Sequence, residues 1–135
     1  MRVLIVCTGN TCRSAMAAAM TRVLLGDDVL VESAGIEAAD RLPATEHAVT
    51  VMAERGVDIL GHRSRPVESL DLSQFDIVVA MTPSVASRLR HLGVEDTRIQ
   101  TINVEDPYGK GLDAYRTAAS EIEHALRSVL LAARR

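Results

Sequence analysis

Residues 3–14 read VLIVCTGNTCRS, an aliphatic run that passes directly into a short polar loop. The run Val3–Val6 has no polar interruption, which is typical of a strand buried on both faces of a parallel sheet. Glycine and asparagine in the polar part allow tight turns. Ser14 can cap a helix, because apolar residues recur at helical spacing after it. The stretch therefore predicts a strand, a tight loop and a helix in direct succession.

The same alternation continues along the chain. Aliphatic runs at residues 29–31, 77–80 and 99–102 predict three further strands, of which the first is predicted to end at residues 33–35. Residues 57–69 are predicted to form a loop. Helical periodicity, capping residues and glycine stops predict four helices. The first ends at Gly26, the second has Pro43 in its first turn and ends at Gly56, the third opens at Pro83 behind a Thr82 cap, and the fourth runs from Leu112 to the chain end.

Strands that alternate with helices form parallel sheets through right-handed crossovers. We therefore predict one α/β domain over residues 1–135, an open four-stranded parallel sheet with helices on both faces and a flavodoxin-like arrangement. Such sheets bind ligands beyond the carboxyl ends of their strands. Cys7, Ser33, Thr82 and Asp106 end or follow predicted strands, so we expect the functional site at that edge.

The composition limits the classes of function. A hydrophobic fraction of 47% over 135 residues can build one core, and a net charge of -3 gives no basic face for a nucleic-acid partner. No apolar stretch approaches the ~20 residues of a membrane span, so we expect a cytoplasmic protein with no membrane partner. Two cysteines cannot form a disulfide framework, and four histidines without ligand spacing predict no metal and no cofactor.

The polar loop has the features of an anion-binding site. The first N–H groups of a helix lack internal partners and lie at the positive end of the helix dipole. Gly9 is expected to take backbone angles barred to other residues, and Asn10 to tolerate a left-handed turn, so that successive amides face one oxyanion. Arg13 adds a planar fork that can hold two phosphate oxygens. The predicted phosphate-binding residues are Thr8, Gly9, Asn10, Thr11, Cys12 and Arg13.

Cys7 precedes this loop and is the candidate nucleophile. A thiol beside a helix N-terminus and an arginine is expected to ionise near neutral pH. The thiolate can attack phosphorus, and a phosphocysteine intermediate divides one difficult hydrolysis into two easier steps. The spacing of Cys7 and Arg13 carries little weight alone, and the preceding strand and following helix make it specific. The alternative is a tight turn between strand and helix that contains two buried cysteines.

Asp106 is the candidate general acid. Residues 106–109 read DPYG, which fits a turn with aspartate first, proline second and glycine fourth. Taken alone, Asp106 is explained at least as well by this turn as by catalysis. Pro107 would hold the carboxyl group at the strand ends, where proton transfer contributes about 10²- to 10⁴-fold to a rate.

Together these motifs resemble those of the low-molecular-weight protein tyrosine phosphatases, over nearly the whole chain. The resemblance implies that Cys7 is the nucleophile, Arg13 the phosphate clamp, and Asp106 the acid for the leaving group and then the base for water. The motifs that carry it are CTGNTCRS at residues 7–14, SAG at 33–35, HRSR at 62–65 and DPYG at 106–109.

The resemblance also implies a supporting network beneath the loop. Its members are Asn10, Ser14, Ser33 and His62, and they would hold Asn10 in a strained conformation. Ser14 would further stabilise the Cys7 thiolate. Cys12 corresponds to a second family cysteine that can pair with Cys7 on oxidation and protect it from over-oxidation.

Thr11 and Tyr108 bear on the choice of substrate. Tyrosine-directed family members mostly carry a bulky aliphatic residue at the Thr11 position and often a second aromatic after Tyr108, whereas the bacterial protein arginine phosphatases carry threonine. A phosphotyrosine ring favours aromatic walls, and this chain has one Phe, two Tyr and no Trp. A planar, cationic phosphoguanidinium suits a carboxylate such as Asp106 and a small polar residue such as Thr11. We therefore expect phosphorylated proteins as substrates, phosphoarginine in preference, and inorganic phosphate as product.

Three alternatives stay open. A phosphotyrosine-protein phosphatase would use the same loop and acid. Arsenate reductases share this loop and fold, but the version coupled to thioredoxin needs two cysteines beyond Cys7 and Cys12. A non-catalytic anion-binding module would keep the loop and lose the acid, which the presence of Asp106 argues against.

Overall fold

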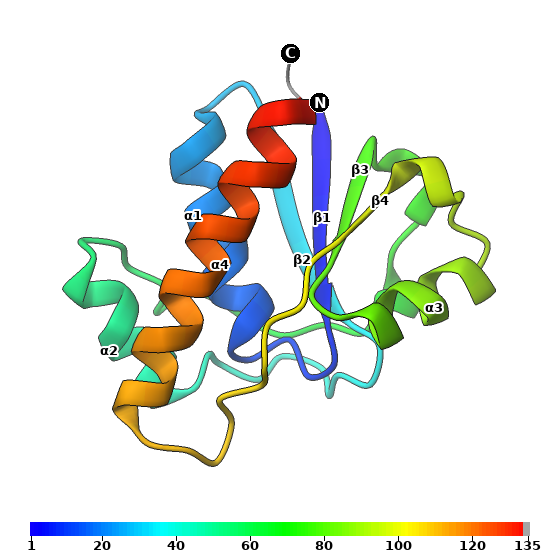
Figure 1. Cartoon of the computed structure of the whole chain (residues 1–135). Helices are drawn as coiled ribbons and strands as arrows, with labels where there is room; N and C mark the ends of the chain where they lie inside the picture. Colours follow the sequence, from blue (N-terminus) through cyan, green and yellow to red (C-terminus); the bar gives the residue numbers. More distant parts are fainter. Residues whose placement is uncertain (134–135) are drawn as a thin grey trace.

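The computed structural model, which describes residues 1–133, contains one four-stranded parallel sheet. Its spatial strand order is β2-β1-β3-β4, as in flavodoxin-like sheets (Figure 1). The predicted open α/β sheet is therefore confirmed. The strands are β1 (Arg2–Cys7), β2 (Leu30–Gly35), β3 (Ile77–Ala80) and β4 (Ile99–Thr101).

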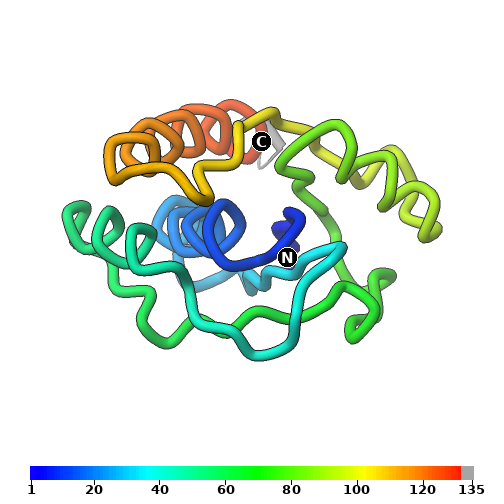
Figure 2. The backbone as a smooth tube through the Cα atoms, turned by 90° about the horizontal axis from the view of Figure 1, so that it is seen from below, coloured from blue at the N-terminus to red at the C-terminus, as the bar shows by residue number. Residues whose placement is uncertain are grey.

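Helices cover both faces of this sheet, as the sequence predicts. Figures 1 and 2 show α1, α2 and α4 together on one face and α3 on the other. The helices are α1 (Arg13–Leu25), α2 (Glu46–Glu54), α3 (Pro83–His91) and α4 (Leu112–Ala133), and three single 3₁₀ turns, Val67–Ser69, Leu72–Gln74 and Asp96–Arg98, lie in the connections. The last helix was predicted to reach the chain end, but residues 134–135 lie outside the described residues.

β1 lies between two hydrophobic cores, and its side chains alternate between them. Val3 and Ile5 pack with residues of α1, α2 and α4, whereas Leu4 and Val6 pack with residues of α3. All four side chains are fully buried. Two-residue alternation between two apolar layers explains why the strand reads as an unbroken aliphatic run.

β2 continues beyond its aliphatic run to Gly35, where the sequence predicts its end. The aliphatic run ends at Val31, but pairing with β1 continues through Glu32 and Ser33 to the last pair, Cys7 with Gly35. Backbone hydrogen bonds to the central strand thus override the polar side chains. This pairing brings Ser33 and Gly35 to the carboxyl edge of the sheet, beside the end of β1.

The start of α1 differs from the prediction. Its cap position is Cys12, whose side chain makes no capping hydrogen bond, and Ser14 lies in the first turn. The Ser14 Oγ lies instead 2.8 Å from the Sγ of Cys7. The Ser14 hydroxyl group, which the sequence suggests as a helix cap, therefore contacts the Cys7 sulfur instead of capping the helix.

The start of α2 also differs, whereas that of α3 is as predicted. Pro43 was expected in the first turn of α2, but the helix begins at Glu46, after Thr45. Thr45 is held in an extended conformation where its N–H donates to the carbonyl oxygen of Thr11. In α3, by contrast, the Thr82 side chain caps the helix by accepting from the N–H of Val85 at 3.3 Å.

Within residues 1–133, every helix falls short of either the length or the apolar character that crossing a bilayer requires.

Candidate active site

Cys7 is the last residue of β1, and only 1% of it is exposed. The N–H of Asn10 donates to its Sγ at 3.2 Å, and the Oγ of Ser14 lies 2.8 Å from the same sulfur. A thiolate can only accept, so Ser14 is the donor in the ionised form. Both contacts stabilise negative charge on the sulfur.

The backbone of the phosphate loop, residues 7–13, offers several free donors. Among the described residues, none accepts a hydrogen bond from the N–H groups of Thr8, Gly9, Thr11 and Cys12. Backbone donors of a folded protein are paired in the great majority of cases. Four unpaired amides within the five residues that precede α1 therefore fit an anion-binding role.

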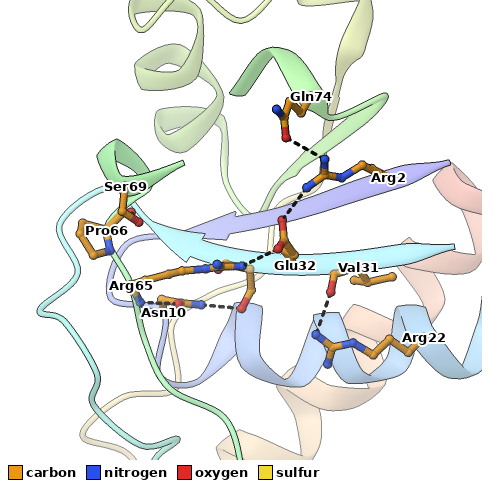
Figure 3. Close-up of polar contacts among 10 residues, drawn as sticks. Arg2, Asn10, Arg22, Val31, Glu32, Arg65, Pro66, Ser69 and Gln74 are labelled. Carbon is orange, nitrogen blue, oxygen red and sulfur yellow. Dashed lines mark hydrogen bonds and ion pairs between the residues drawn. The ribbon is translucent and has the colours of Figure 1, made fainter. Parts of the chain in front are cut away.

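Asn10 is the centre of the hydrogen bonds that hold this loop, and it is fully buried. Its Nδ2 donates to the Oγ of Ser14 at 2.7 Å and to the Oγ of Ser33 at 3.0 Å. Its Oδ1 accepts from the N–H of Arg65 at 3.0 Å, as Figure 3 shows. The Nε2 of His62 donates to its carbonyl oxygen at 2.6 Å. Asn10, Ser14, Ser33, His62 and Arg65 are together called the Asn10 network below.

The four network residues expected from the sequence, Asn10, Ser14, Ser33 and His62, are thus brought together. Arg65 belongs to the HRSR motif at residues 62–65, but the sequence predicts no role for it. Burial lowers the pKa of His62, and the nearby arginines add to that effect, so the ring is neutral at physiological pH. A neutral ring bonded through Nε2–H leaves Nδ1 without a proton.

Backbone strain in the loop falls on Asn10 rather than on Gly9. Asn10 has a φ of 58°, in the left-handed region, whereas Gly9 has no positive φ, so the expectation for Gly9 was wrong. Asparagine tolerates this conformation better than most residues, and the hydrogen bonds of the Asn10 network over-determine it. A methyl group at Gly9 would meet only the Thr11 Oγ1, at 3.8 Å.

Gly35 is a residue whose importance the sequence reveals only as part of a motif. A Cβ atom there would lie 2.5 Å from the carbonyl oxygen of Thr8 and 2.7 Å from the Cβ of Ala38. The carbonyl oxygens of Cys7 and Thr8 accept from the N–H groups of Ile36 and Glu37, both at 3.0 Å. The chain after β2 therefore packs directly on the phosphate loop, and only glycine fits at the contact.

Arg13 and Asp106 meet at the edge of the loop. The Arg13 side chain is buried, its Nη1 donates to the carbonyl oxygen of Val104 at 3.1 Å, and its Nη2 lies 3.5 Å from the Asp106 Oδ2. Its Nε is buried and has no partner among the described residues. A fixed guanidinium with a free donor fits the predicted phosphate clamp.

Cys12 also contacts Asp106, since its Sγ donates to the Asp106 Oδ1 at 3.4 Å. Burial, together with the charges of Asp106 and Cys7, raises the pKa of Cys12 to about 12. Cys12 is therefore a neutral thiol at physiological pH, and the Asp106 carboxyl group is held against the loop by one thiol and one guanidinium.

The turn after Asp106 has a different register from the predicted one. Lys110 N–H donates to the Pro107 carbonyl oxygen at 2.9 Å, so the turn spans residues 107–110 with Gly109, at a φ of 80°, in its third position. The Asp106 side chain caps this turn instead, as its Oδ1 accepts from the N–H of Tyr108 at 3.0 Å. Aspartate commonly accepts in this way from the backbone N–H two residues further along the chain.

The residues expected to select the substrate lie at the loop and its rim. Thr11 is half-buried, and Tyr108 is 68% exposed. The other two aromatic side chains are buried away from solvent. Phe75 packs in the α3 core, and Tyr115 lies on α4 with its ring edge-on to His47.

Known proteins are similar to this chain over nearly its whole length. The family model for the low molecular weight phosphotyrosine protein phosphatases matches residues 2–135. A protein-arginine-phosphatase of Bacillus subtilis is 34% identical, over 96% of this chain and 94% of that protein. Arsenate reductase 2 of Staphylococcus haemolyticus is 33% identical, over 91% of both chains. The crystal structure of a low molecular weight protein tyrosine phosphatase from T. tengcongensis is 38% identical with a TM-score of 0.88, over 98% of this chain and 99% of that one.

Proposed function

Because this chain belongs to the low molecular weight phosphotyrosine protein phosphatase family, we propose that Cys7 is the nucleophile with which it hydrolyses phosphorylated protein side chains, phosphoarginine in preference. The observation that carries the proposal is the environment of the Cys7 sulfur. Two donors contact that sulfur, and unpaired backbone amides and the Arg13 guanidinium follow it in the chain. This arrangement provides a nucleophile and an anion site side by side.

In the first step, the Cys7 thiolate attacks phosphorus and forms the S–P bond of a phosphocysteine. The bond from phosphorus to the leaving nitrogen or oxygen breaks, and the leaving atom takes a proton from Asp106. The loop amides and Arg13 stabilise the charge on the three equatorial oxygens. Asp106 is suited to this exchange because its side chain is 47% exposed and lies at the rim of the loop.

In the second step, water attacks the phosphocysteine. The Asp106 carboxylate accepts the proton from water, the S–P bond breaks, and the Cys7 thiolate is restored as inorganic phosphate leaves. Ser14 donates to the sulfur as the thiolate departs, which stabilises it as a leaving group. The same carboxyl group thus serves as acid and then as base.

The preference for phosphoarginine is supported by the few aromatic side chains near the loop. A phosphotyrosine ring gains from aromatic contacts, but of three aromatic residues only Tyr108 is exposed. A phosphoguanidinium is planar and cationic, and it favours a carboxylate such as that of Asp106, which lies at the edge of the loop beside Arg13 and Cys12. Thr11 adds a small polar side chain in place of a bulky one.

The test compares initial rates on a phosphoarginine peptide and on a phosphotyrosine peptide of the same sequence. We expect a higher kcat/KM for phosphoarginine, and a shift towards phosphotyrosine in Thr11→Ile. Thr50→Ile, an exposed threonine on α2, is the matched control and should keep the original ratio. A higher kcat/KM for phosphotyrosine in the unaltered protein would establish the tyrosine-directed alternative instead. Equal ratios for all three proteins would remove Thr11 as the selecting residue.

A further inference from the structure

A cavity of about 830 Å³ opens beside the Asn10 network, and Ser33 and His62 form part of its wall. Cys7, Arg13 and Asp106 do not line it, so it is separate from the proposed catalytic loop. Arginines outnumber acidic residues in its wall, which gives an excess of positive charge. The charged residues of the wall are Arg22, Arg41, Arg63, Arg65, Asp40 and Asp58.

Two of the four guanidinium groups are oriented by neutral partners alone. Arg22 donates to the carbonyl oxygen of Val31 at 2.8 Å (Figure 3). Arg63 donates to the carbonyl oxygen of His62 at 2.6 Å, and the Arg41 guanidinium makes no hydrogen bond or ion pair with the described residues. A carbonyl oxygen fixes a guanidinium without cancelling its charge.

Arg65 is the only one of the four with an acidic partner. Its Nη2 lies 3.5 Å from Glu32, which it shares with Arg2, and its Nε donates to the carbonyl oxygen of Ser33 at 3.0 Å. Figure 3 shows the Arg65 and Arg22 side chains beside the same strand, β2. One carboxylate divided between two arginines leaves the cavity with uncompensated positive charge.

The same positive charge contributes to lowered pKa values of two residues in the wall. Partial burial lowers the pKa of Arg22, and the charge of Arg65 lowers it further. After burial, the charges of Arg22, Arg63 and Arg65 likewise contribute to the lowered pKa of His62. Like charges that depress one another's protonation are favourable neighbours for an anion.

The segment that carries Arg41 is held in an unusual conformation. Arg41 has a φ of 63°, in the left-handed region that few non-glycine residues occupy. Its N–H donates to the carbonyl oxygen of the buried Ser64 at 2.8 Å, and the Ser64 Oγ donates to the carbonyl oxygen of Ala39 at 2.6 Å. The backbone of Arg41 is therefore held beside the cavity, while its guanidinium is left free to meet an anion there.

From this cavity and its charge we propose that the protein has a second anion site, which binds a phosphate group carried either by free phosphate or by another protein. Guanidinium groups match phosphate oxygens in geometry as well as in charge. The site is also connected to the catalytic loop, because three of its wall residues, Ser33, His62 and Arg65, bind Asn10 directly. An anion bound here raises the pKa of His62. Because His62 donates to Asn10, anion binding also affects the catalytic loop.

The experiment is a titration of the ¹⁵N-labelled protein with inorganic phosphate, followed by NMR. We expect saturable shifts at the amides of Arg41, Gly61 and Arg63, and a rise in the pKa of His62. Shifts at Gly9 and Thr11, which report the catalytic loop, are fitted separately. Absence of loop shifts would count against the proposed function alone, and absence of cavity shifts against the second site alone.

Charge variants make the test specific. Arg41 and Arg63 are exposed, so R41Q/R63Q should fold normally and should weaken binding at the cavity by at least about tenfold. R88Q/R127Q removes the same charge from exposed positions on α3 and α4 and should leave the cavity affinity unchanged. D58N removes a negative charge from the wall and should tighten binding.

The proposal is overturned if the cavity shifts do not saturate, or if R41Q/R63Q and R88Q/R127Q weaken them equally. Either result would mean that phosphate binding depends only on the net charge of the protein and not on this cavity. A parallel titration with O-phosphoserine identifies the source of the ligand. Tighter binding of inorganic phosphate points to the free ion, and tighter binding of the monoester points to a phosphate carried by a protein.

Discussion

Asn10 and Asp106 both hold groups of the phosphate loop, but the fold secures them to different degrees. Asn10 is fully buried, and its side chain and backbone make hydrogen bonds of 2.6–3.2 Å to residues from four segments. Asp106 has a side chain that is 47% exposed, and its contacts with Arg13 and Cys12 measure 3.5 and 3.4 Å.

This difference separates two tasks. An anion site must keep its donors in place while charge develops, which a buried and fully bonded residue achieves at no further cost. A general acid must exchange protons with leaving group and water, which requires access and some freedom to move. The four predictions below test this division, from the largest expected effect to the smallest.

Cys7→Ser tests the inner part of the loop. A serine hydroxyl is not ionised at neutral pH, so we expect turnover to fall by at least about 10⁴-fold. Because the Asn10 network is untouched, inorganic phosphate should still bind. Steady-state kinetics with an aryl phosphate and calorimetry with phosphate measure the two properties. Substantial remaining turnover would end the assignment of Cys7 as nucleophile.

Asp106→Asn tests the rim. We expect kcat to fall by about 10²- to 10⁴-fold with poor leaving groups and less with activated aryl phosphates. Stability should change little, because the side chain is half exposed. Glu105→Gln, an exposed neighbour that pairs with Lys110, is the control and should keep its activity. A loss that is the same for every leaving group would place the acid elsewhere.

Gly35→Ala tests whether the fold or the loop itself sets the loop position. The new methyl group would overlap the Thr8 carbonyl oxygen, so we expect a loss of about 1–3 kcal/mol in the free energy of unfolding and a lower kcat. Gly111→Ala is the control, since a Cβ there meets no heavy atom within 4 Å. Urea unfolding measures both variants. Equal stability of the two would show that the contact with β2 is dispensable.

Cys12→Ala should have the smallest effect. It removes a weak thiol donor from Asp106, so we expect kcat to fall by less than about tenfold. With its pKa raised to about 12, Cys12 should also resist alkylation at neutral pH, where Cys7 should react. Mass spectrometry after brief iodoacetamide treatment measures this. Preferential labelling of Cys12 would contradict the assignment of the two sulfurs.

Much of the fold follows from patterns within short segments. The aliphatic runs predict the strands, and for Ile77–Ala80 the bounds are the same, because a strand buried on both faces needs apolar side chains at every position. In β2 the polar Glu32 and Ser33 carry the strand on to Gly35, the end that the sequence predicts, although the aliphatic run stops at Val31. Pairing with the central strand decides those positions.

Local sequence also determined the phosphate loop, because strand, loop and helix follow one another over residues 2–25 and need no distant partner. Only the tertiary structure decided which distant residues complete it. Arg65 reaches Asn10 across 55 positions and Cys12 meets Asp106 across 94, and Gly35 leaves room for the Thr8 carbonyl oxygen. Hydrophobic periodicity shows which face of a segment is buried. The contacts named here involve other segments, and they arise only when parallel strands bring their carboxyl ends to one edge of the sheet.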